Sequence, residues 1–180
     1  MFCETKGVVV LDNEGRRIYS KYYNPPRDLA THTAQQLFEQ QLHAKTLKTN
    51  PSNQVSEVLI IEPFVAVFKI LNDVTVYLLG DNEENEILLA SLLDSLTESL
   101  EMLYKGELDR RRILEEVDLL VIAVDESFED GLVMCCDAMS IVERVVMREG
   151  ATSTKTAKKE GAFERAIQNA KDAITKTLMR

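Results

Sequence analysis

The stretch from residue 74 to residue 103 constrains the fold of this chain more than any other. It begins with the run Val-Thr-Val-Tyr-Leu-Leu, closed by Gly80, and such β-branched and aromatic residues predict a strand. An acidic turn follows, and after it leucines recur at spacings of three and four, at Leu89, Leu92, Leu93, Leu96, Leu100 and Leu103. On a 3.6-residue period these leucines form one stripe, which predicts an amphipathic helix. Strand, turn and helix together predict the spine of an α+β fold.

Four more apolar runs predict the rest of a sheet. Residues 7–11 and 16–22 are joined by Asp-Asn-Glu-Gly, which is typical of a hairpin turn. Residues 55–61 and 64–71 lead into the strand at residue 74, with Glu-Pro and Asn-Asp at the turns. Together these runs predict a five-stranded antiparallel sheet. Strict alternation in the second strand would place three side chains on one face: Ile18, Ser20 and Tyr22.

Helices are predicted in the segments that flank this sheet. The first spans residues 27–45, and its apolar stripe is Ala30, Ala34, Leu37, Phe38, Leu42 and Leu47. The second spans residues 109–128, with the stripe Ile113, Leu114, Val117, Leu120, Val121, Val124 and Phe128. Leu119, Ile122 and Ala123 fall on its opposite side, so this helix should be covered on both sides. A further helix is expected over residues 137–147.

The chain is predicted to divide into an α+β domain at residues 1–149, a flexible linker at 150–162, and a C-terminal amphipathic helix at 163–180. The linker has no large apolar residue. The last segment has a thin stripe made by Phe163, Ala166, Ile167, Ala170, Ile174 and Leu178.

Charge and composition narrow the classes of function. From residue 151 onward there are seven Lys/Arg and three Asp/Glu, a net charge of +4. Because the whole chain carries −9, residues 1–150 carry a net charge of −13. An acidic body argues against nucleic acid as a partner, because phosphate contacts need a basic face. The sequence has no apolar run long enough for a membrane span and no signal-peptide core at its start, and its cysteines offer no disulfide framework. We therefore expect a cytosolic protein.

The residues offer little catalytic chemistry. The acidic turn at residues 81–86 is the best candidate for a catalytic or metal cluster, but capping and the helix dipole explain its composition equally well. His32 and His43 lie outside the apolar stripe of their helix and are expected to be solvated, while Cys135 and Cys136 are expected to pack as small apolar side chains. Nucleotide, hydrolase and zinc motifs are absent from the sequence. We expect no enzyme activity, no cofactor and no metal.

Several pieces of the sequence resemble a known family. Residues 8–23 read Val-Val-Val-Leu-Asp-Asn-Glu-Gly-Arg-Arg-Ile-Tyr-Ser-Lys-Tyr-Tyr, residues 79–80 are Leu-Gly, and residues 84–89 are Glu-Asn-Glu-Ile-Leu-Leu. Val-Asp-Glu at 124–126, Asp-Gly at 130–131 and Val-Glu-Arg-Val at 142–145 follow. These pieces and the ending of the chain resemble the zeta-subunit family of coatomer, the COPI vesicle coat. The small (sigma) chains of clathrin adaptors share the first hairpin and the Val-Asp-Glu piece.

This resemblance implies a fold, a function and a set of partners. The fold would be longin-like, with a five-stranded antiparallel sheet flanked by helices. The function would be that of a non-enzymatic coat subunit that binds the trunk of the gamma subunit within heptameric coatomer. An Arf-family GTPase would recruit that coat to the cytoplasmic face of Golgi membranes for retrograde Golgi-to-ER and intra-Golgi transport. The alternative is a sigma chain of a clathrin-adaptor-type complex or another longin-domain trafficking protein.

Apolar residues that fall off the predicted core stripes of the two central helices are candidate contacts with a partner: Ile87, Met102, Leu119 and Ile122. The apolar stripe of the C-terminal segment adds the candidates Phe163, Ile167, Ile174 and Leu178. The basic C-terminal segment could dock on protein or on lipid, and its thin stripe favours docking on coat protein.

Overall fold

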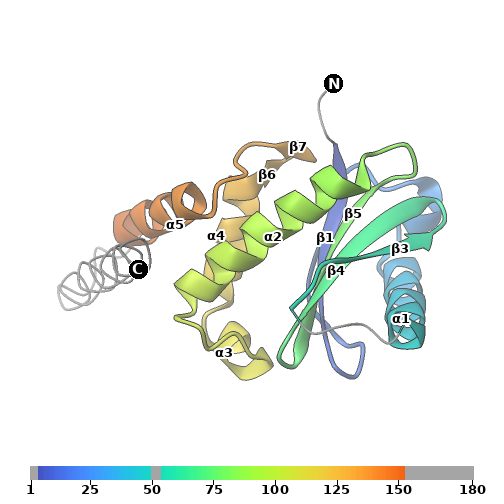
Figure 1. Cartoon of the computed structure of the whole chain (residues 1–180), viewed down its shortest axis with the longest axis horizontal. Helices are drawn as coiled ribbons and strands as arrows, with labels where there is room; N and C mark the ends of the chain where they lie inside the picture. The colour runs from blue at the N-terminus through green and yellow to red at the C-terminus, as the bar shows by residue number, and fades with distance from the viewer. Residues whose placement is uncertain (1–3, 50–53, 153–180) are drawn as a thin grey trace, which may run out of the picture. The chain divides into compact units, whose positions relative to one another are not determined.

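A single antiparallel sheet with the strand order β2-β1-β5-β4-β3 forms the centre of the fold (Figure 1). Its strands are β1 (Thr5–Asp12), β2 (Arg17–Tyr22), β3 (Glu57–Ile61), β4 (Phe64–Leu71) and β5 (Val74–Asp81). The structure is a computed structural model and describes residues 4–49 and 54–152. The predicted five-stranded antiparallel sheet is confirmed, with β5 as its middle strand.

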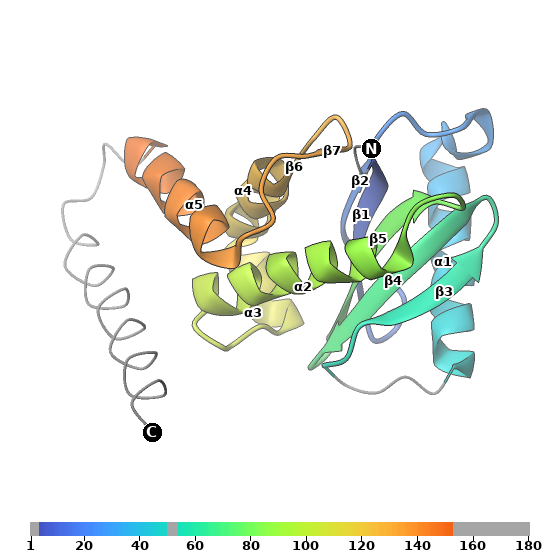
Figure 2. The same ribbon diagram turned by 45° about the horizontal axis from the view of Figure 1, so that its top comes forward.

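Helices cover both faces of this sheet. The helical elements of the described chain are the 3-10 turn η1 (Arg27–Leu29), α1 (His32–Lys48), α2 (Glu86–Leu103), α3 (Arg110–Glu115), α4 (Val117–Ser127) and α5 (Ala138–Thr152), of which α1 and α2 lie against the sheet. Figure 2 shows α1 on one face of the sheet and α2 on the other. By its internal contacts the chain divides into two compact units, residues 1–145 and 146–180.

The leucine helix α2 holds the larger core, as its spacing predicts. Leu89, Leu93 and Leu96 are fully buried, and Leu92 and Leu100 nearly so. They pack with Val8, Val10, Val65, Val67, Val76 and Leu78 of the sheet. Asn85 begins the helix, because its side-chain Oδ1 accepts hydrogen bonds from the amides of Ile87 and Leu88. The acidic turn before α2 thus starts a helix.

The sheet is apolar on both faces because each face has its own core. In β4, Val65 and Val67 face the α2 side, whereas Phe64, Ala66 and Phe68 pack on the other side with Phe38 and Leu42 of α1. Strand β5 alternates in the same way. This arrangement explains why the β4 sequence shows no polar face.

A bulge in the first hairpin changes which side chains of β2 share a face of the sheet. Val10 pairs with Tyr19 but Leu11 pairs with Arg17, so Ile18 is skipped in the register. Ile18 therefore packs with the α2-side core, while Tyr22 packs on the α1 side. The prediction that both lie on one face is wrong, because one extra residue reverses the alternation.

Helix α1 buries only part of the predicted stripe, namely Phe38 and Leu42. It begins at His32, after η1, and its buried residues are Phe38, Glu39, Leu42 and Thr46. Leu37 and Leu47 are exposed instead. Glu39 is buried as well, in contact with Arg17 and Tyr22 of β2. His43 is half-buried, and its Nδ1 atom has no hydrogen-bond partner, so the expectation of a solvated side chain is wrong for this histidine.

A break at Glu116 divides the predicted helix 109–128 into α3 and α4. Glu116 has φ −130° and ψ 48°, outside the helical region. Its carbonyl accepts a hydrogen bond of 2.7 Å from the Tyr104 hydroxyl. The break turns α4 relative to the continuous helix that the periodicity predicts. Leu114 and Val117 of the predicted stripe are exposed, and Leu119, from the opposite side, lies in the core. The rest of the buried stripe is as predicted at Ile113, Leu120, Val124 and Phe128.

The β6–β7 hairpin (Phe128–Glu129 and Leu132–Val133) turns on two residues with positive φ, Asp130 at 49° and Gly131 at 87°. Two successive residues with positive φ are typical of a type I′ turn, for which Asp-Gly is a favoured pair. The Gly131 carbonyl also accepts hydrogen bonds from the Thr5 amide (2.7 Å) and hydroxyl (3.0 Å). The turn therefore ties the hairpin to the start of β1.

Replacing Gly131 with alanine is expected to lower the free energy of unfolding by about 1–3 kcal/mol. A Cβ atom there would lie 2.5 Å from the Thr5 carbonyl oxygen, and φ of +87° is strained for any L side chain. Urea denaturation measures the loss. Gly106→Ala is the matched control for φ, because Gly106 has φ +80° but open space around it. Equal losses in the two variants would contradict the close contact with Thr5.

The last described helix is longer than the predicted helix at residues 137–147. Helix α5 extends to Thr152, past residue 149. Ile141, Val142 and Val145 are buried, as its periodicity predicts. Residues 153–180, which include most of the predicted linker and the whole C-terminal helix, lie outside the described residues and stay a prediction.

Candidate partner interface

The candidate site of this chain is a surface, because many large apolar side chains lie outside its two cores and are exposed. Large apolar residues are exposed on α1, β3, α2, α3, α4 and the β6–β7 hairpin, among them Leu37, Leu47, Val58, Ile60, Ile87, Leu114 and Leu132. Scattered exposed leucines are ordinary, whereas neighbouring ones indicate contact with a partner. The positions of the predicted contacts therefore decide where a partner could bind.

Ile87 and Met102 lie at opposite ends of α2. Ile87 is 78% exposed, the highest fraction among the exposed large apolar side chains of the described residues. Met102 is half-buried. Both lie off the leucine stripe, as predicted. Ile87 is the better placed of the two for contact with a partner, because covering it would remove more apolar surface from water.

Leu119 and Ile122 do not form the free helix face that periodicity suggested. Leu119 is 6% exposed and belongs to the α2-side core. Ile122 is half-buried and packs against the same core. The face assignment behind these choices is wrong, because the break at Glu116 rotates α4. Their role in binding stays untested, as does that of Phe163, Ile167, Ile174 and Leu178, which lie outside the described residues.

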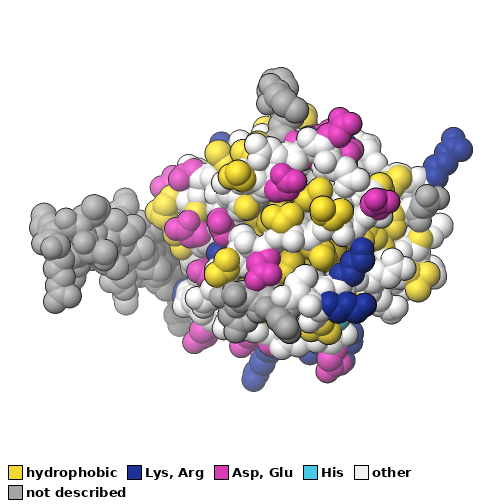
Figure 3. Space-filling view, turned by 45° about the vertical axis from the view of Figure 1, so that its right-hand side comes forward, with side chains coloured by type: hydrophobic (Ala, Val, Ile, Leu, Met, Phe, Trp, Pro, Cys, Tyr) yellow, Lys and Arg dark blue, Asp and Glu magenta, His cyan; other side chains and the backbone are white. Residues whose placement is uncertain are grey.

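Strand β3 exposes apolar side chains that are not among the predicted partner contacts. Val58 is 47% exposed and Ile60 is 65% exposed. Figure 3 shows hydrophobic side chains gathered near the middle of one face of the molecule, with acidic side chains beside them. The sequence predicts the strand but does not say that it forms an edge of the sheet, and edge position is what leaves these side chains uncovered.

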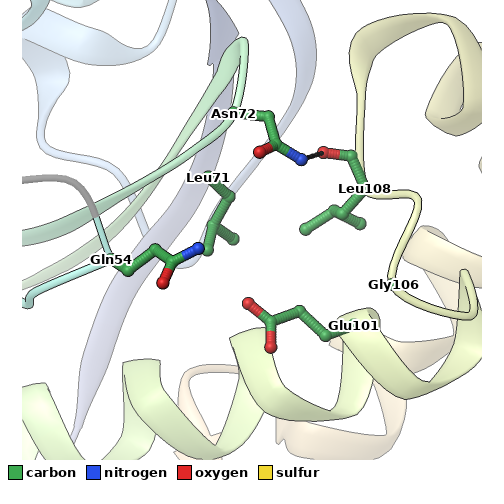
Figure 4. Close-up of a pocket in the computed structure, with 6 residues that line it drawn as sticks. All are labelled: Gln54, Leu71, Asn72, Glu101, Gly106 and Leu108. Carbon is green, nitrogen blue, oxygen red and sulfur yellow. Dashed lines mark hydrogen bonds between the residues drawn. The ribbon is translucent and has the colours of Figure 1, made fainter.

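A small pocket of about 180 Å³ lies where α2 ends beside the β4–β5 turn (Figure 4). Leu71 and Leu108 line its apolar part, and Gln54, Asn72 and Glu101 line its polar part. The Asn72 side chain donates a hydrogen bond of 3.1 Å to the Leu108 carbonyl. Glu101 is its single ionisable lining residue, so the pocket has no acid–base pair.

Two buried carboxylates, Asp12 and Glu39, serve the fold. Asp12 accepts hydrogen bonds from the amides of Glu14 and Arg16, and its Oδ2 lies 2.8 Å from Arg16 Nε and 3.2 Å from Arg110 Nε. Burial raises the pKa of Asp12, but the hydrogen bonds from Arg16 and Glu14 outweigh it and hold that pKa below its usual value. A carboxylate held ionised by so many donors is suited to linking the β1–β2 turn to α3 and is a poor proton acceptor.

The other candidate groups stay apart. Among residues 4–49 and 54–152, no three His, Cys, Asp or Glu side chains come together in a way that could hold a metal ion. Cys135 packs against the core as expected, whereas Cys136 is exposed. Within the same part of the chain, no helix has the length and apolarity needed to cross a bilayer.

Comparison with known proteins decides the family. The family model of the clathrin adaptor complex small chain matches residues 4–152, which include every described strand and helix. This chain belongs to that family. Small chains of this kind are non-enzymatic subunits of coats and adaptor complexes. The prediction that this chain is not an enzyme agrees with its family.

Curated relatives within the family are zeta subunits of coatomer. Coatomer subunit zeta-1 of Arabidopsis thaliana is 32% identical over 177 residues, which cover 98% of this chain and 97% of that protein. Coatomer subunit zeta-1 of Homo sapiens is 31% identical and covers 97% of this chain and 93% of its own length. Coatomer subunit zeta of Saccharomyces cerevisiae is 35% identical over 148 residues, which cover 78% of this chain and 76% of that protein. The chain is thus a coatomer-zeta-like adaptor small chain.

Solved structures agree on the fold. A chain in a homology model of the full-length AP-3 complex superimposes with a TM-score of 0.62 over 83% of this chain and 96% of its own. The two sequences are only 16% identical, so this likeness supports the longin-like α+β fold alone.

Proposed function

We propose that this chain is the zeta-type small subunit of the COPI coat. In this role it binds the trunk of the gamma subunit and acts, within heptameric coatomer, in retrograde Golgi-to-ER and intra-Golgi vesicle transport. An Arf-family GTPase brings the coat to the cytoplasmic face of the Golgi membrane, so the small subunit is peripheral on that membrane. The observation that carries the proposal is the match to coatomer zeta subunits over 97–98% of this chain, from plant to human.

The structure supports a role in assembly through its surface. The described part of the chain has exposed apolar side chains on both helical layers, and its small pocket beside the β4–β5 turn has no acid–base pair. A large partner surface would cover such side chains, and the apolar area removed from water would stabilise the complex. Helix α2 is well placed to bind a partner, because its buried leucines hold it against the sheet while Ile87 is exposed at its start.

The assignment is tested by co-expression with candidate large subunits. We expect this chain to co-purify with the gamma subunit of coatomer and not with the large chain of a clathrin adaptor. Preferential recovery with the clathrin-adaptor chain would overturn the COPI assignment in favour of a sigma-type role.

Ile87→Asp tests whether the start of α2 contacts the gamma subunit. A charge at a position that becomes buried in an interface is costly, so we expect a loss of co-purification of about tenfold or more. Leu37→Asp is the matched control, because Leu37 is 55% exposed on α1, on the opposite side of the sheet. Circular dichroism should show both variants folded. Full recovery of gamma with Ile87→Asp would exclude this contact, and Leu119 is unsuitable for the test because it is a core residue.

A further inference from the structure

Strand β3 is an open edge of the sheet. It pairs with β4 from Glu57 to Ile61 without a shift in register, so no bulge twists the edge away. Its interior, Val-Leu-Ile, has no proline and no charge, the devices that usually block an exposed edge. Lys45 Nζ of α1 donates a hydrogen bond of 3.4 Å to the Ile60 carbonyl on this edge.

The direction of that hydrogen bond shows which backbone groups are available. The Ile60 carbonyl faces away from β4, and groups two residues apart on a strand face the same edge. The backbone of Val58 is therefore directed outward as well. A strand laid along this edge could pair with both residues and would displace the exposed Lys45 side chain.

The side chains along the edge match the spacing of an added strand. Val58 pairs with Val67, and Ile60 pairs with Val65, so both lie on the α2 side of the sheet. They are 47% and 65% exposed because β3 is the last strand. An adjacent strand places its own side chains about 5 Å from these, at alternate positions, and would cover both.

The charges around the edge specify the chemistry of the occupant. Ile61 pairs with Phe64, and Phe64 pairs with Asp81, so the carboxyl end of β3 lies at the same end of the sheet as Asp81. Glu62, Asp81 and Glu83 are all exposed at this end. Residues 1–150 carry a net charge of −13, which disfavours a second copy of this chain as occupant. The surface therefore suits a segment with Lys or Arg at the end that meets these carboxylates.

We propose that the β3 edge binds an extended segment of a partner protein by strand addition. The segment has aliphatic side chains at alternate positions, which cover Val58 and Ile60, and basic residues that lie beside Glu62 and Asp81. Antiparallel pairing is the slightly more stable arrangement and places those basic residues at the amino end of the segment. This inference is independent of the coat assignment, because it rests on β3 and not on Ile87.

The test uses the full chain and a labelled synthetic peptide that begins with lysines and continues with alternating valine and threonine. We expect saturable binding by fluorescence anisotropy and slower hydrogen exchange of the Val58 and Ile60 amides when the peptide is bound. The double variant Val58→Lys, Ile60→Lys should weaken binding by about tenfold or more, because the apolar cover is lost and the charges repel the lysines. A peptide with glutamates in place of the lysines should bind more weakly than the original.

Leu47→Lys is the matched control, since Leu47 is 60% exposed on α1 and lies across the sheet from Val58. It should bind the peptide like the parent chain. Unchanged exchange of the β3 amides with bound peptide would overturn the proposal, and this measurement needs no variant. Sedimentation of the chain without peptide gives a second way to overturn it: a dimer that the β3 double variant dissociates would make a second copy the occupant.

Discussion

Replacing Leu96 with alanine is expected to lower the free energy of unfolding by about 2–5 kcal/mol. Leu96 is fully buried in the middle of α2, among core residues of β4, β5 and α4. The loss combines the transfer free energy of the removed methyl groups with the cavity that the packed neighbours leave behind. Because a domain of this kind has about 5–15 kcal/mol of stability in total, one such change takes a large share of it.

Urea denaturation followed by circular dichroism measures this loss. Ile87→Ala is the control on the same helix, because Ile87 is 78% exposed and its truncation should change the free energy of unfolding by less than about 0.5 kcal/mol. If both variants lost similar stability, the leucine stripe would not be the core-facing side of α2.

Replacing Glu39 with glutamine is expected to cost roughly 3–5 kcal/mol of stability, because it leaves a largely buried guanidinium without its counter-charge. Arg17 Nε donates to Glu39 Oε2 at 2.7 Å, and Arg17 Nη2 lies 2.7 Å from Oε1. The Tyr22 hydroxyl donates to Oε1 at 2.8 Å. Burial first, and then the Glu39 carboxylate, raise the pKa of the Tyr22 hydroxyl, which keeps it protonated as a donor. The loss is read from urea denaturation of the variant.

A double-mutant cycle separates the Arg17–Glu39 pair from other effects of the substitution. The variant that combines Arg17→Gln with Glu39→Gln should lose less stability than the sum of the single variants, because neither charge is then left alone. Glu98→Gln on the exposed face of α2 is the control for the loss of one carboxylate. Additive losses in the cycle would show that the pair does not hold α1 on β2.

Periodicity succeeded where one element buries one face. The leucines of α2 recur at helical spacing, and the structure buries that stripe against the sheet. Periodicity failed where a bulge or a helix break shifted the repeat of buried side chains along the chain. The bulge at Ile18 reversed the faces of β2, and the break at Glu116 turned α4, so Leu119 moved from a predicted partner contact into the core. Neither event leaves a strong local signal, since no proline or glycine marks either position.

The candidate interface was predicted only in part for a related reason. Ile87 lies off the leucine stripe and is exposed, so the sequence identified it. Val58 and Ile60 were missed, because a strand at the edge of a sheet and a strand in its middle have the same apolar composition.

The sequence by itself determined the strands, the start of α2 at Asn85, the Asp130-Gly131 turn and the family. Each of these depends on neighbours along the chain, where spacing, capping and the φ preference of glycine act directly. Only the tertiary structure decided that Glu39 of α1 and Leu119 of α4 are also buried, and that β3 is an edge. Those features depend on contacts between distant residues, such as Glu39 with Arg17 and Tyr104 with Glu116, which no local pattern records.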